Sequence, residues 1–505
     1  MEEKGRLTTV FQERALLSGQ SLHEYFDPIR DDEPPRALRR RIYAFDDELN
    51  RCPIPNDRPY GISRTLPVTV FHPILAQFKY DLANLSTFEP TSQQVERTLE
   101  FIVKSLEIYP VEEDGIDQTR PVLQRLLGHR NWILIGDCPT TGKVCHDRDL
   151  ALVVAVEWRN EFGSGPGDAS VEVAEAYRKH FLQDSLQRVR NSSCCPSVLF
   201  AIMGPYLCMQ GVIFLDKVIY QAFTEYIWLG SDPYLDENVM RIARVFNATA
   251  KAIRNLHMYY DGLELCDTPV PSRLFPRPTF RPEDQPDFQL TFTEKLCPES
   301  EIPRLLFGAD MTEQGEATHL PKKVVVKFAE RYGEQAHRLL AEHHLAPGRH
   351  FCKRTLCGLW MIVMDRAEGQ DAYSLFPGEP PNYVKIDVDR AIQLLHQHGF
   401  VHGEICMSNI LVVMRSRSQQ QVVAATPTST EEGIEMDVDD LDSETAGAVL
   451  VDFDWTGKDG VANYPPMWYN QPVAGGDGAQ NLDRIGVMKK EHDRFMFGRL
   501  GHWSV

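Results

Sequence analysis

The fold of this chain is decided by two stretches near its C-terminus. They are His402-Gly403-Glu404-Ile405-Cys406-Met407-Ser408-Asn409 and, after a polar insert, Val449-Leu450-Val451-Asp452-Phe453-Asp454. Asn409 and Asp452 each lie beside a short hydrophobic run, and their side-chain oxygens suit Mg²⁺. A phosphoryl-transfer site needs an acidic base near the acceptor hydroxyl, an Asn five residues later and an Asp on a second strand. The order and spacing here fit that layout, with Glu404 where Asp is expected.

Length and composition indicate more than one globular domain. A chain of 505 residues predicts two or three domains, and 43% apolar residues with 10% aromatics can fill sizeable cores. The formal charge of -19 argues against a protein that binds nucleic acid over much of its surface, because phosphate contacts need clustered Lys and Arg. A local basic cleft is compatible with that charge.

The cysteines and the N-terminus indicate an intracellular protein, cytoplasmic or nuclear. The 11 cysteines are scattered and form no CxxC pair, which is typical of reduced thiols. The N-terminal segment is charged and lacks the apolar core of a signal peptide. Ser197 to Leu215 carries no charge, but Gly204-Pro205 interrupts it, so we expect two buried strands and no membrane partner.

The N-terminal half divides into a polar region over 1–90 and an α/β domain over 91–265. Helical periodicity predicts helices at Thr91–Ile108, Val171–Phe181 and Asp236–Tyr260. Branched apolar runs predict strands at Trp132–Ile135 and Ala151–Val156, with turn residues over Gly136–Arg148 between them.

A proline-rich stretch separates this half from the next. Six prolines between Pro269 and Pro286 predict a linker over 266–287, because proline at that density blocks helix and sheet. The domain over 288–505 should contain strands and helices in alternation; the strands are expected at Phe288–Phe292, Arg304–Phe307, Lys323–Phe328 and Leu359–Met364, and the helices at Arg331–His343 and Asp387–His398. Residues 415–448, polar and acidic, predict a disordered insert.

Lys327 lies on the β-branched run Val324-Val325-Val326. In a nucleotide site such a lysine neutralises phosphate charge and is oriented by a carboxylate on the following helix. Glu334 and Glu342 both fit that role, and the sequence does not choose between them.

Lys327 to Trp455 resembles the small kinase-like domains of fungal proteins, which are related to aminoglycoside-phosphotransferase-type and eukaryotic-like kinases. The phrases that carry the resemblance are VVVKFAERYGEQAHRLLAE, MIVMDRAEG, LLHQHGFVHGEICMSNI and VLVDFDWTG. It implies a two-lobed fold that binds ATP and Mg²⁺ and phosphorylates protein. It places Met364 and Asp365 near the adenine, Lys327 at the phosphates, Asn409 and Asp452 on Mg²⁺, and Glu404 at the catalytic-base position. Glu334 and Glu342 both stay candidates for the carboxylate that orients Lys327.

Three departures from that family bear on activity. The segment CPESEIP between the first two expected strands has no glycine to cover the phosphates. Glu404 is one methylene longer than the expected Asp, and such misplacement can be severe for catalysis. No APE-like segment occurs in the 53 residues after Asp452. A catalytically inactive scaffold is therefore one alternative reading of this domain.

A second group of candidate catalytic residues lies in the stretch Val154-Ala155-Val156-Glu157-Trp158-Arg159. Metal-dependent nucleases place an Asp at one strand end and Glu-x-Lys on the next strand, where the carboxylates bind Mg²⁺. Asp137 follows the first expected strand, and Glu157-x-Arg159 ends the second; Asp147 and Asp149 are alternative acids. Arginine keeps the charge of the usual lysine but cannot give up a proton at neutral pH.

This region resembles the restriction-endonuclease-like domains that precede kinase-like domains in Crinkler-type fungal effectors. The phrases are VAVEWRNEFGSGPGD and FAIMGPYLCMQGVIF. The resemblance implies a DNA-binding, metal-dependent nuclease whose kinase-like half senses nucleotide. The sequence thus predicts an α/β, restriction-endonuclease-like domain and an α+β, two-lobed protein-kinase-like domain.

Overall fold

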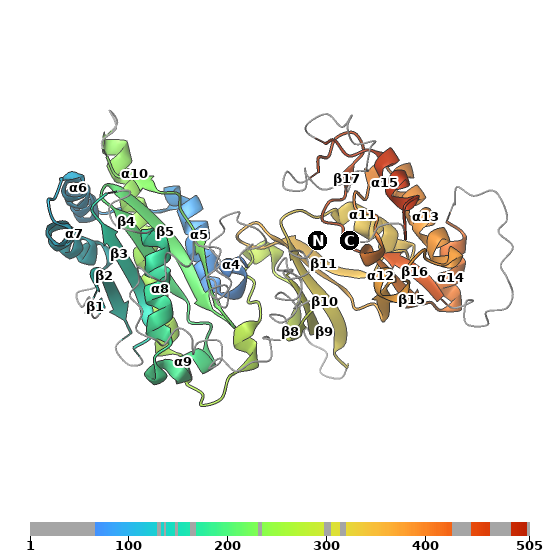
Figure 1. Cartoon of the computed structure of the whole chain (residues 1–505), viewed down its shortest axis with the longest axis horizontal. Coiled ribbons are helices and arrows are strands. Elements are labelled where there is room, and N and C mark those ends of the chain that lie inside the picture. Colours follow the sequence, from blue (N-terminus) through green and yellow to red (C-terminus); the bar gives the residue numbers. More distant parts are fainter. Residues whose placement is uncertain are drawn as a thin grey trace, which may run out of the picture. The chain divides into compact units, whose positions relative to one another are not determined.

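A computed structural model of the chain describes residues 66–128, 133–135, 138–146, 150–161, 168–230, 235–296, 305–313, 320–426, 446–464 and 486–501. These residues form two compact units (Figure 1). The first unit ends at Arg281 and the second begins at Pro282.

The first unit is built on a mixed sheet in the order β1-β2-β3-β4-β5-β6, with β7 paired to β5. Only β3 and β4 run parallel; the other pairings are antiparallel. The strands are β1 (Ile133–Ile135), β2 (Cys138–Cys145), β3 (Leu152–Arg159), β4 (Ser197–Met203), β5 (Tyr206–Phe214), β6 (Val218–Ala222) and β7 (Ile227–Trp228).

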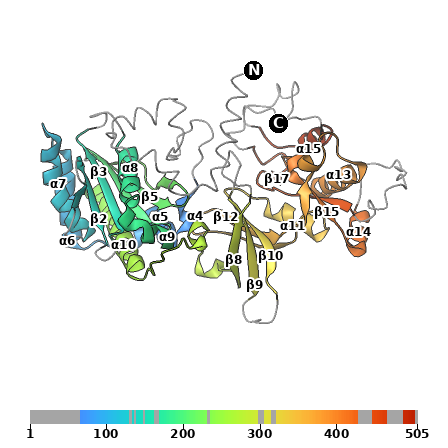
Figure 2. The ribbon, with the colours of Figure 1, turned by 60° about the horizontal axis from the view of Figure 1, so that its bottom comes forward.

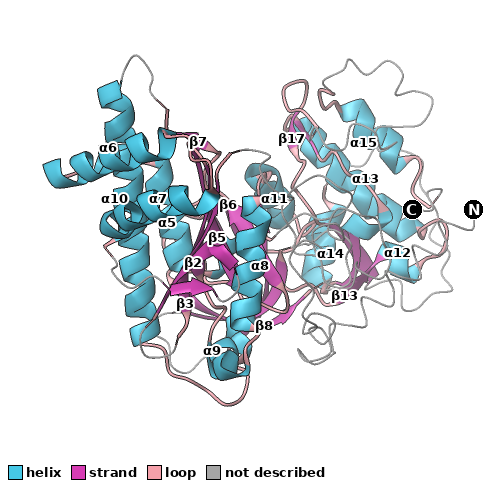
Figure 3. Ribbon diagram, turned by 60° about the vertical axis from the view of Figure 1, so that its left-hand side comes forward, coloured by secondary structure: helices cyan, strands magenta, loops and turns pink. Residues whose placement is uncertain are grey.

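Helices cover both faces of this sheet. Helix α8 (Ala169–Phe181) connects the parallel strands β3 and β4 and packs on both of them. Figure 3 shows the sheet between α8 and the helices α5, α7 and α10. The helices of this unit are α4 (Val68–Phe71), α5 (Pro73–Ala83), α6 (Ser92–Leu106), α7 (Glu112–Leu127), α8, α9 (Gln187–Ser192) and α10 (Leu235–Asp261). Because both faces are covered, β3 and β4 are buried along their length, as their continuous apolar runs indicate.

The prediction of two strands from Ser197 to Leu215 is confirmed, since β4 and β5 pair antiparallel across a turn at Gly204. Gly204 has a φ of +53°. A Cβ there would come within 2.4 Å of the carbonyl oxygen of Asn160, so only glycine fits. This turn brings the end of β4 against the end of β3.

The structure differs from the sequence-based prediction at three places in this half. Strand β2 occupies most of the region predicted as turn over Gly136–Arg148. Helices α4 and α5 lie within the region predicted as a polar N-terminal segment, and Phe78 is part of the hydrophobic core.

The third difference concerns the proline-rich segment, which packs on the first unit up to Arg281 instead of serving as a spacer. Its short 3-10 turn, η6 (Pro271–Leu274), carries Arg273, which is buried. The Arg273 guanidinium donates to the carbonyls of Phe214 and Leu215 at the end of β5. The proline-rich sequence therefore forms an irregular but packed strap.

The second unit begins, after the 3-10 turn η7 (Pro282–Asp284), with a five-stranded antiparallel sheet in the order β11-β12-β10-β9-β8 (Figure 2). The strands are β8 (Phe288–Lys295), β9 (Leu306–Glu313), β10 (Lys322–Ala329), β11 (Arg349–Arg354) and β12 (Trp360–Asp365). Helix α11 (Glu334–Glu342) packs on β11. The four predicted strands are present; β11 was not predicted.

A mainly helical part follows, with two small antiparallel sheets, β13-β15-β16 and β14-β17. Its strands are β13 (Gly369–Asp371), β14 (Phe400–Val401), β15 (Ile410–Met414), β16 (Ala446–Leu450) and β17 (Gly457–Lys458). Its helices are α12 (Ala372–Leu375), α13 (Asn382–Gln397), α14 (Arg417–Ala424) and α15 (Lys490–Phe497), besides the 3-10 turn η8 (Met407–Asn409).

The insert predicted as disordered over 415–448 is ordered at both flanks. Arg415 is buried and pairs with Asp387 of α13, and Val423 of α14 is buried. Asp387 also accepts the backbone N–H of Ala448. The prediction is therefore wrong for these flanks, while 427–445 lies outside the described residues.

Candidate functional site

The site begins with Lys327, near the middle of the five-stranded sheet. Its neighbours in register are Leu306 on β9 and Ile362 on β12. Side chains alternate along a strand, so the buried Val326 and Phe328 point to one face and Lys327 to the other. The alternation of apolar and polar residues along β10 thus determines the face of the sheet from which the Lys327 ammonium projects.

The Lys327 ammonium bridges two carboxylates of the loop after β16. Its Nζ lies 2.7 Å from Oδ1 of Asp452 and 2.7 Å from Oδ1 of Asp454. Burial lowers the pKa of Lys327, but the two carboxylates outweigh burial, so the pKa is raised above its usual value. Lys327 is therefore charged and held by this loop.

The backbone at Asp452 is in the left-handed region, with a φ of +65°. That conformation is uncommon for a residue with a Cβ, although Asp tolerates it better than most, and it tends to occur at functional sites. Phe453, the next residue, is buried, which fixes the loop between the two aspartates. The turn thus directs both carboxylates to one ammonium.

A hairpin brings Asn409 and Asp452 together across the insert. Asn409 immediately precedes β15, and β15 pairs with β16 from Ile410 opposite Leu450. The backbone N–H of Val451 donates to the carbonyl of Asn409 at 2.9 Å. Asn409 is buried, and its amide Nδ2 donates to the carbonyl of Glu404, so its amide oxygen is the atom suited to a metal.

The segment that carries Glu404 is held by Asp493, which the sequence analysis did not single out. Asp493 lies on α15 and is fully buried. Its carboxylate accepts the backbone N–H groups of His402 and Gly403 and a hydrogen bond from His396 Nε2. Gly403 has a φ of +85°, and a Cβ there would come within 2.2 Å of Met488. The sequence signal for Asp493 is weak: it shares a helix face with the buried Met496.

Phe453 joins the loop that carries Asp452 and Asp454 to α11. Its ring stacks on His337 of α11 with centroids 4.7 Å apart and contacts His402 at 5.3 Å. The backbone N–H of Gly333, just before α11, donates to the Phe453 carbonyl. His337 is buried, with Nδ1 bonded to the Tyr332 hydroxyl and Nε2 to the Pro347 carbonyl. A displacement of α11 would therefore disturb the loop.

Three predicted site residues have other contacts. Glu334 pairs with Arg349 of β11 at 3.0 Å, so the carboxylate partners of Lys327 are Asp452 and Asp454 instead. Met364 is buried in the sheet and Asp365 ends β12, after which the chain crosses to β13. Asp365 pairs with His350 and Lys322; burial raises its pKa, but these two partners outweigh burial and lower it.

In the first unit, Arg159 is the centre of a group of ion pairs at the end of β3. Its guanidinium lies 3.0 Å from Glu157 of the same strand and 3.5 Å from Glu112 of α7, and it also pairs with Glu172 of α8. Glu157 and Arg159 thus share a face, as predicted. Glu157 is 1% exposed and Arg159 is largely buried.

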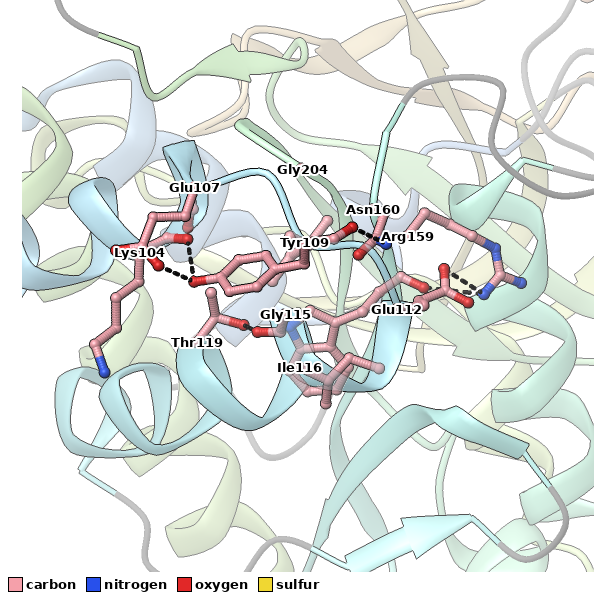
Figure 4. Close-up of a pocket in the computed structure, with 13 residues that line it drawn as sticks. Lys104, Glu107, Tyr109, Glu112, Gly115, Ile116, Thr119, Arg159, Asn160 and Gly204 are labelled. Atoms are coloured by element: carbon pink, nitrogen blue, oxygen red, sulfur yellow. Dashed lines mark hydrogen bonds and ion pairs between the residues drawn. The ribbon is translucent and has the colours of Figure 1, made fainter.

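A small pocket opens beside Arg159 (Figure 4). Figure 4 shows Glu112 directed at the guanidinium and Asn160 bonded to the backbone carbonyl of Tyr109. Asp137, Asp147 and Asp149, the other acids of the predicted nuclease motif, lie outside the described residues.

Two features are absent from the described part of the chain. No three His, Cys, Asp or Glu side chains there are grouped as a metal-binding cluster. No helix among those residues has the length and apolar character needed to cross a membrane.

Comparisons with known proteins find kinases over part of the chain. It is similar to the kinase PK-1 of Cydia pomonella granulovirus, with 12% identity over 42% of this chain and 66% of that chain and a TM-score of 0.26. It is also similar to the structure of the Rad53 kinase domain and SCD2, with 10% identity over 42% of this chain and 62% of that chain and a TM-score of 0.25. The chain thus spans just under two thirds of the length of each. No protein-family model and no curated protein matches the sequence, so the Crinkler, fungal and restriction-endonuclease resemblances stay predictions.

Proposed function

We propose that the second unit binds ATP with Mg²⁺ and transfers the terminal phosphoryl group to protein. The observation that carries this proposal is the contact between Lys327 of the sheet and Asp452 at the end of a hairpin whose other end holds Asn409. A phosphate-binding cation, a carboxylate and an amide at one place are the groups that phosphoryl transfer requires.

The side chains of Asp452 and Asn409 suit an Mg²⁺ ion that arrives bound to the nucleotide phosphates. Mg²⁺ is usually held by one or two carboxylates together with substrate phosphates and water. Asp452 and Asn409 would hold the ion, which when bound neutralises phosphate charge and bridges it to the protein.

The remaining residues have distinct proposed roles. Lys327 neutralises phosphate charge, and the connection after Met364 and Asp365 contacts the adenine in this proposal. Glu404 accepts the proton of the acceptor hydroxyl, because its segment is fixed by Asp493 and its carbonyl is bonded to Asn409.

A thermal-shift titration of the full chain with ATP, with and without Mg²⁺, tests nucleotide binding. A ligand at a hundred times its Kd stabilises the folded state by about 2.7 kcal/mol. We expect the melting temperature to rise with ATP only when Mg²⁺ is present, and the rise to be lost in Lys327→Met and Asp452→Asn. Lys323→Met is the matched control, since Lys323 lies on the same strand but is exposed. No shift in the wild-type chain would contradict the proposal.

The nuclease alternative for the first unit rests on Glu157 and Arg159 on one face at the end of β3. Arg159 already supplies the positive charge that these carboxylates need, which weighs against a divalent ion in the same place. Incubation of duplex DNA with the chain and Mn²⁺ or Mg²⁺ tests it: cleavage that Glu157→Ala abolishes would favour the nuclease. Cleavage that persists in Glu157→Ala would show that residues other than Glu157 carry out the reaction.

A further inference from the structure

Helix α6 of the first unit carries a row of exposed apolar side chains. Leu99, Val103 and Leu106 are spaced four and three residues apart, so they lie on one side of the helix, and they are between 38% and 50% exposed. Ile108, in the connection to α7, is 87% exposed and extends this row, as does Val111. A surface helix normally presents polar side chains to water, so this apolar stripe indicates an interaction surface.

The rest of α6 is already held by the core of the first unit. Phe101 and Ile102 are buried, and the Phe101 ring packs edge-on against Phe246 of α10 with centroids 5.3 Å apart. Helix α7 lies beside α6 (Figure 1), and Arg125 of α7 pairs with Glu100. The exposed stripe is therefore not needed to anchor the helix.

Acidic side chains border the apolar stripe. Between Glu96 and Asp114 the chain has six acidic and two basic residues. Glu96 lies one turn before the stripe, Glu107 borders it at the end of α6, and Glu113 and Asp114 follow in the first turn of α7. Among the described residues, Glu96, Glu113 and Asp114 have no cation within ion-pair distance. A complementary partner therefore combines an apolar face with basic side chains.

The chain itself contains such a segment before its first described residue. Residues 36–49 read RALRRRIYAFDDEL and have four arginines among the first six positions. Their apolar residues recur at the spacing of an amphipathic helix: Leu38, Ile42, Phe45 and Leu49. We propose that this basic segment, residues 36–49, docks as a helix on the apolar stripe of α6 in the same chain. Recognition of an amphipathic helix through anchors at this spacing is a common mode of peptide binding.

Charge sets the orientation of the basic segment, and the length of chain permits it. The arginines, at the start of the segment, pair best with Glu113 and Asp114 beyond the C-terminal end of α6, which makes the two helices antiparallel. Residues 50–65 connect the segment to Leu66 and span up to about 50 Å when extended. A domain of about 200 residues has a radius of gyration of about 16 Å, so this connection can reach α6.

This orientation places the arginines beside the pocket that Arg159 lines. Glu107 and Glu112, at the C-terminal end of the stripe, also line that pocket (Figure 4). The docked segment would therefore cover this end of the first unit. Because exposed charges contribute to the contact, high salt should weaken it.

Hydrogen exchange of the full chain, read by mass spectrometry, tests the contact. A short tether gives an effective concentration of about 1 mM, so a contact with a Kd of about 0.1 mM keeps the segment docked about ten times as long as free. We expect the amides of residues 36–49 to exchange about tenfold more slowly in the wild-type chain than in Val103→Asp. Met258→Asp is the matched control and should keep the protection, since Met258 is an exposed apolar residue of α10 in the same unit.

A charge reversal tests the acidic border independently of α6. Arg39→Glu with Arg40→Glu should also lose the protection, although it changes no described residue. Adding Glu113→Lys and Asp114→Lys to that variant should restore part of the protection, because the charges are then exchanged between the two surfaces.

Three results would overturn the proposal. The first is rapid exchange over residues 36–49 in the wild-type chain, and the second is equal protection in Val103→Asp. The third is protection that rises with protein concentration, because it would identify a second copy of the chain as the occupant. Unchanged melting temperatures of Val103→Asp and of the Arg39→Glu, Arg40→Glu variant show that lost protection is not a folding defect.

Discussion

The carboxylate of Asp493 accepts the backbone N–H of Gly403 at 2.8 Å, although 90 residues separate the two in the chain. The bond joins α15 to the segment that carries Glu404. Because Asp493 also accepts from His402 and His396, one buried side chain satisfies three donors. The position of the proposed base therefore depends on a helix near the C-terminus.

Asp493→Ala should destabilise the second unit strongly. The substitution leaves buried N–H donors without an acceptor, which costs about 1–3 kcal/mol for each group. We expect a loss of at least about 3 kcal/mol in urea denaturation. Glu491→Ala, on the same helix but exposed, is the matched control and should change stability by less than about 0.5 kcal/mol. Equal stability of the two variants would show that water replaces the carboxylate.

Much of the framework could be predicted from sequence because its signals are local. The apolar runs of β4 and β5 on either side of Gly204-Pro205 predict a buried pair of strands, and the structure contains it. The order of Lys327, Asn409 and Asp452 along the chain also predicted that they lie near one another. Lys327 contacts Asp452, and the carbonyl of Asn409 accepts the backbone N–H of Val451, the residue before Asp452.

The missed features depend on contacts between distant residues. Strand β2 contains Pro139 and Gly142, which predict a turn, but pairing with β1 and β3 on either side overrides that preference. Strand β11 lies at the sheet edge and half of its residues are Arg or Lys, so it has little apolar alternation. The contacts of Lys327 with Asp454 and of Arg415 with Asp387 have no local sequence signal.

The insert should tolerate replacement only between its ordered flanks. A short Gly/Ser link in place of 427–445 should leave the melting temperature nearly unchanged, because loop length has a weak effect on stability. Replacing all of 415–448 should lower it by many degrees, since Arg415, Val423 and Ala448 would lose buried contacts. Calorimetry of both variants measures the difference; equal melting temperatures would show that the flanks contribute nothing.

Arg159→Met should destabilise the first unit by about 3–5 kcal/mol, because it removes the buried cation that pairs with both Glu157 and Glu172. Glu157→Gln in the same chain should recover part of that loss, since it removes one of the buried negative charges that Arg159 balances. The control is Arg120→Met on α7, whose pair with Asp117 is at the surface and should contribute less than about 1 kcal/mol. Denaturation midpoints followed for each variant measure these effects. Equal losses in Arg159→Met and Arg120→Met would contradict the importance of the buried group.

Acid should destabilise the second unit through His337. Burial, followed by the charges of Arg349 and Lys327, lowers the His337 pKa from 6.5 to about 4, although the Pro347 hydrogen bond opposes this shift. Between these values the unfolded chain binds a proton that the folded chain does not, so stability falls as pH falls from 6.5 toward 4. The full effect is about 3 kcal/mol.

His337→Leu isolates this contribution. The variant keeps an apolar contact with Phe453 but cannot titrate, so the decline of stability over this pH range should be smaller than in the wild-type chain. Denaturation at several pH values measures the two slopes. His72 and His180, whose pKa values burial lowers to about 3 and about 4, remain in both proteins and serve as an internal reference. Identical slopes would mean that His337 is not the group that titrates.

Glu404→Asp should raise phosphoryl-transfer turnover, because it restores the reach of the base that the motif normally has. The backbone at Glu404 is fixed by the hydrogen bonds of Asn409 and Asp493, so the substitution changes chiefly the position of the carboxylate. A shift of about 1 Å can change turnover up to a hundredfold.

Transfer of labelled phosphate to a protein acceptor, with ATP affinity measured separately, compares Glu404→Asp with the wild-type chain. Glu404→Gln, which cannot accept the proton, should abolish transfer while ATP still binds. Equal or lower turnover in Glu404→Asp at unchanged ATP affinity would indicate that the site is adapted to the longer side chain or that the unit binds nucleotide without transferring phosphate.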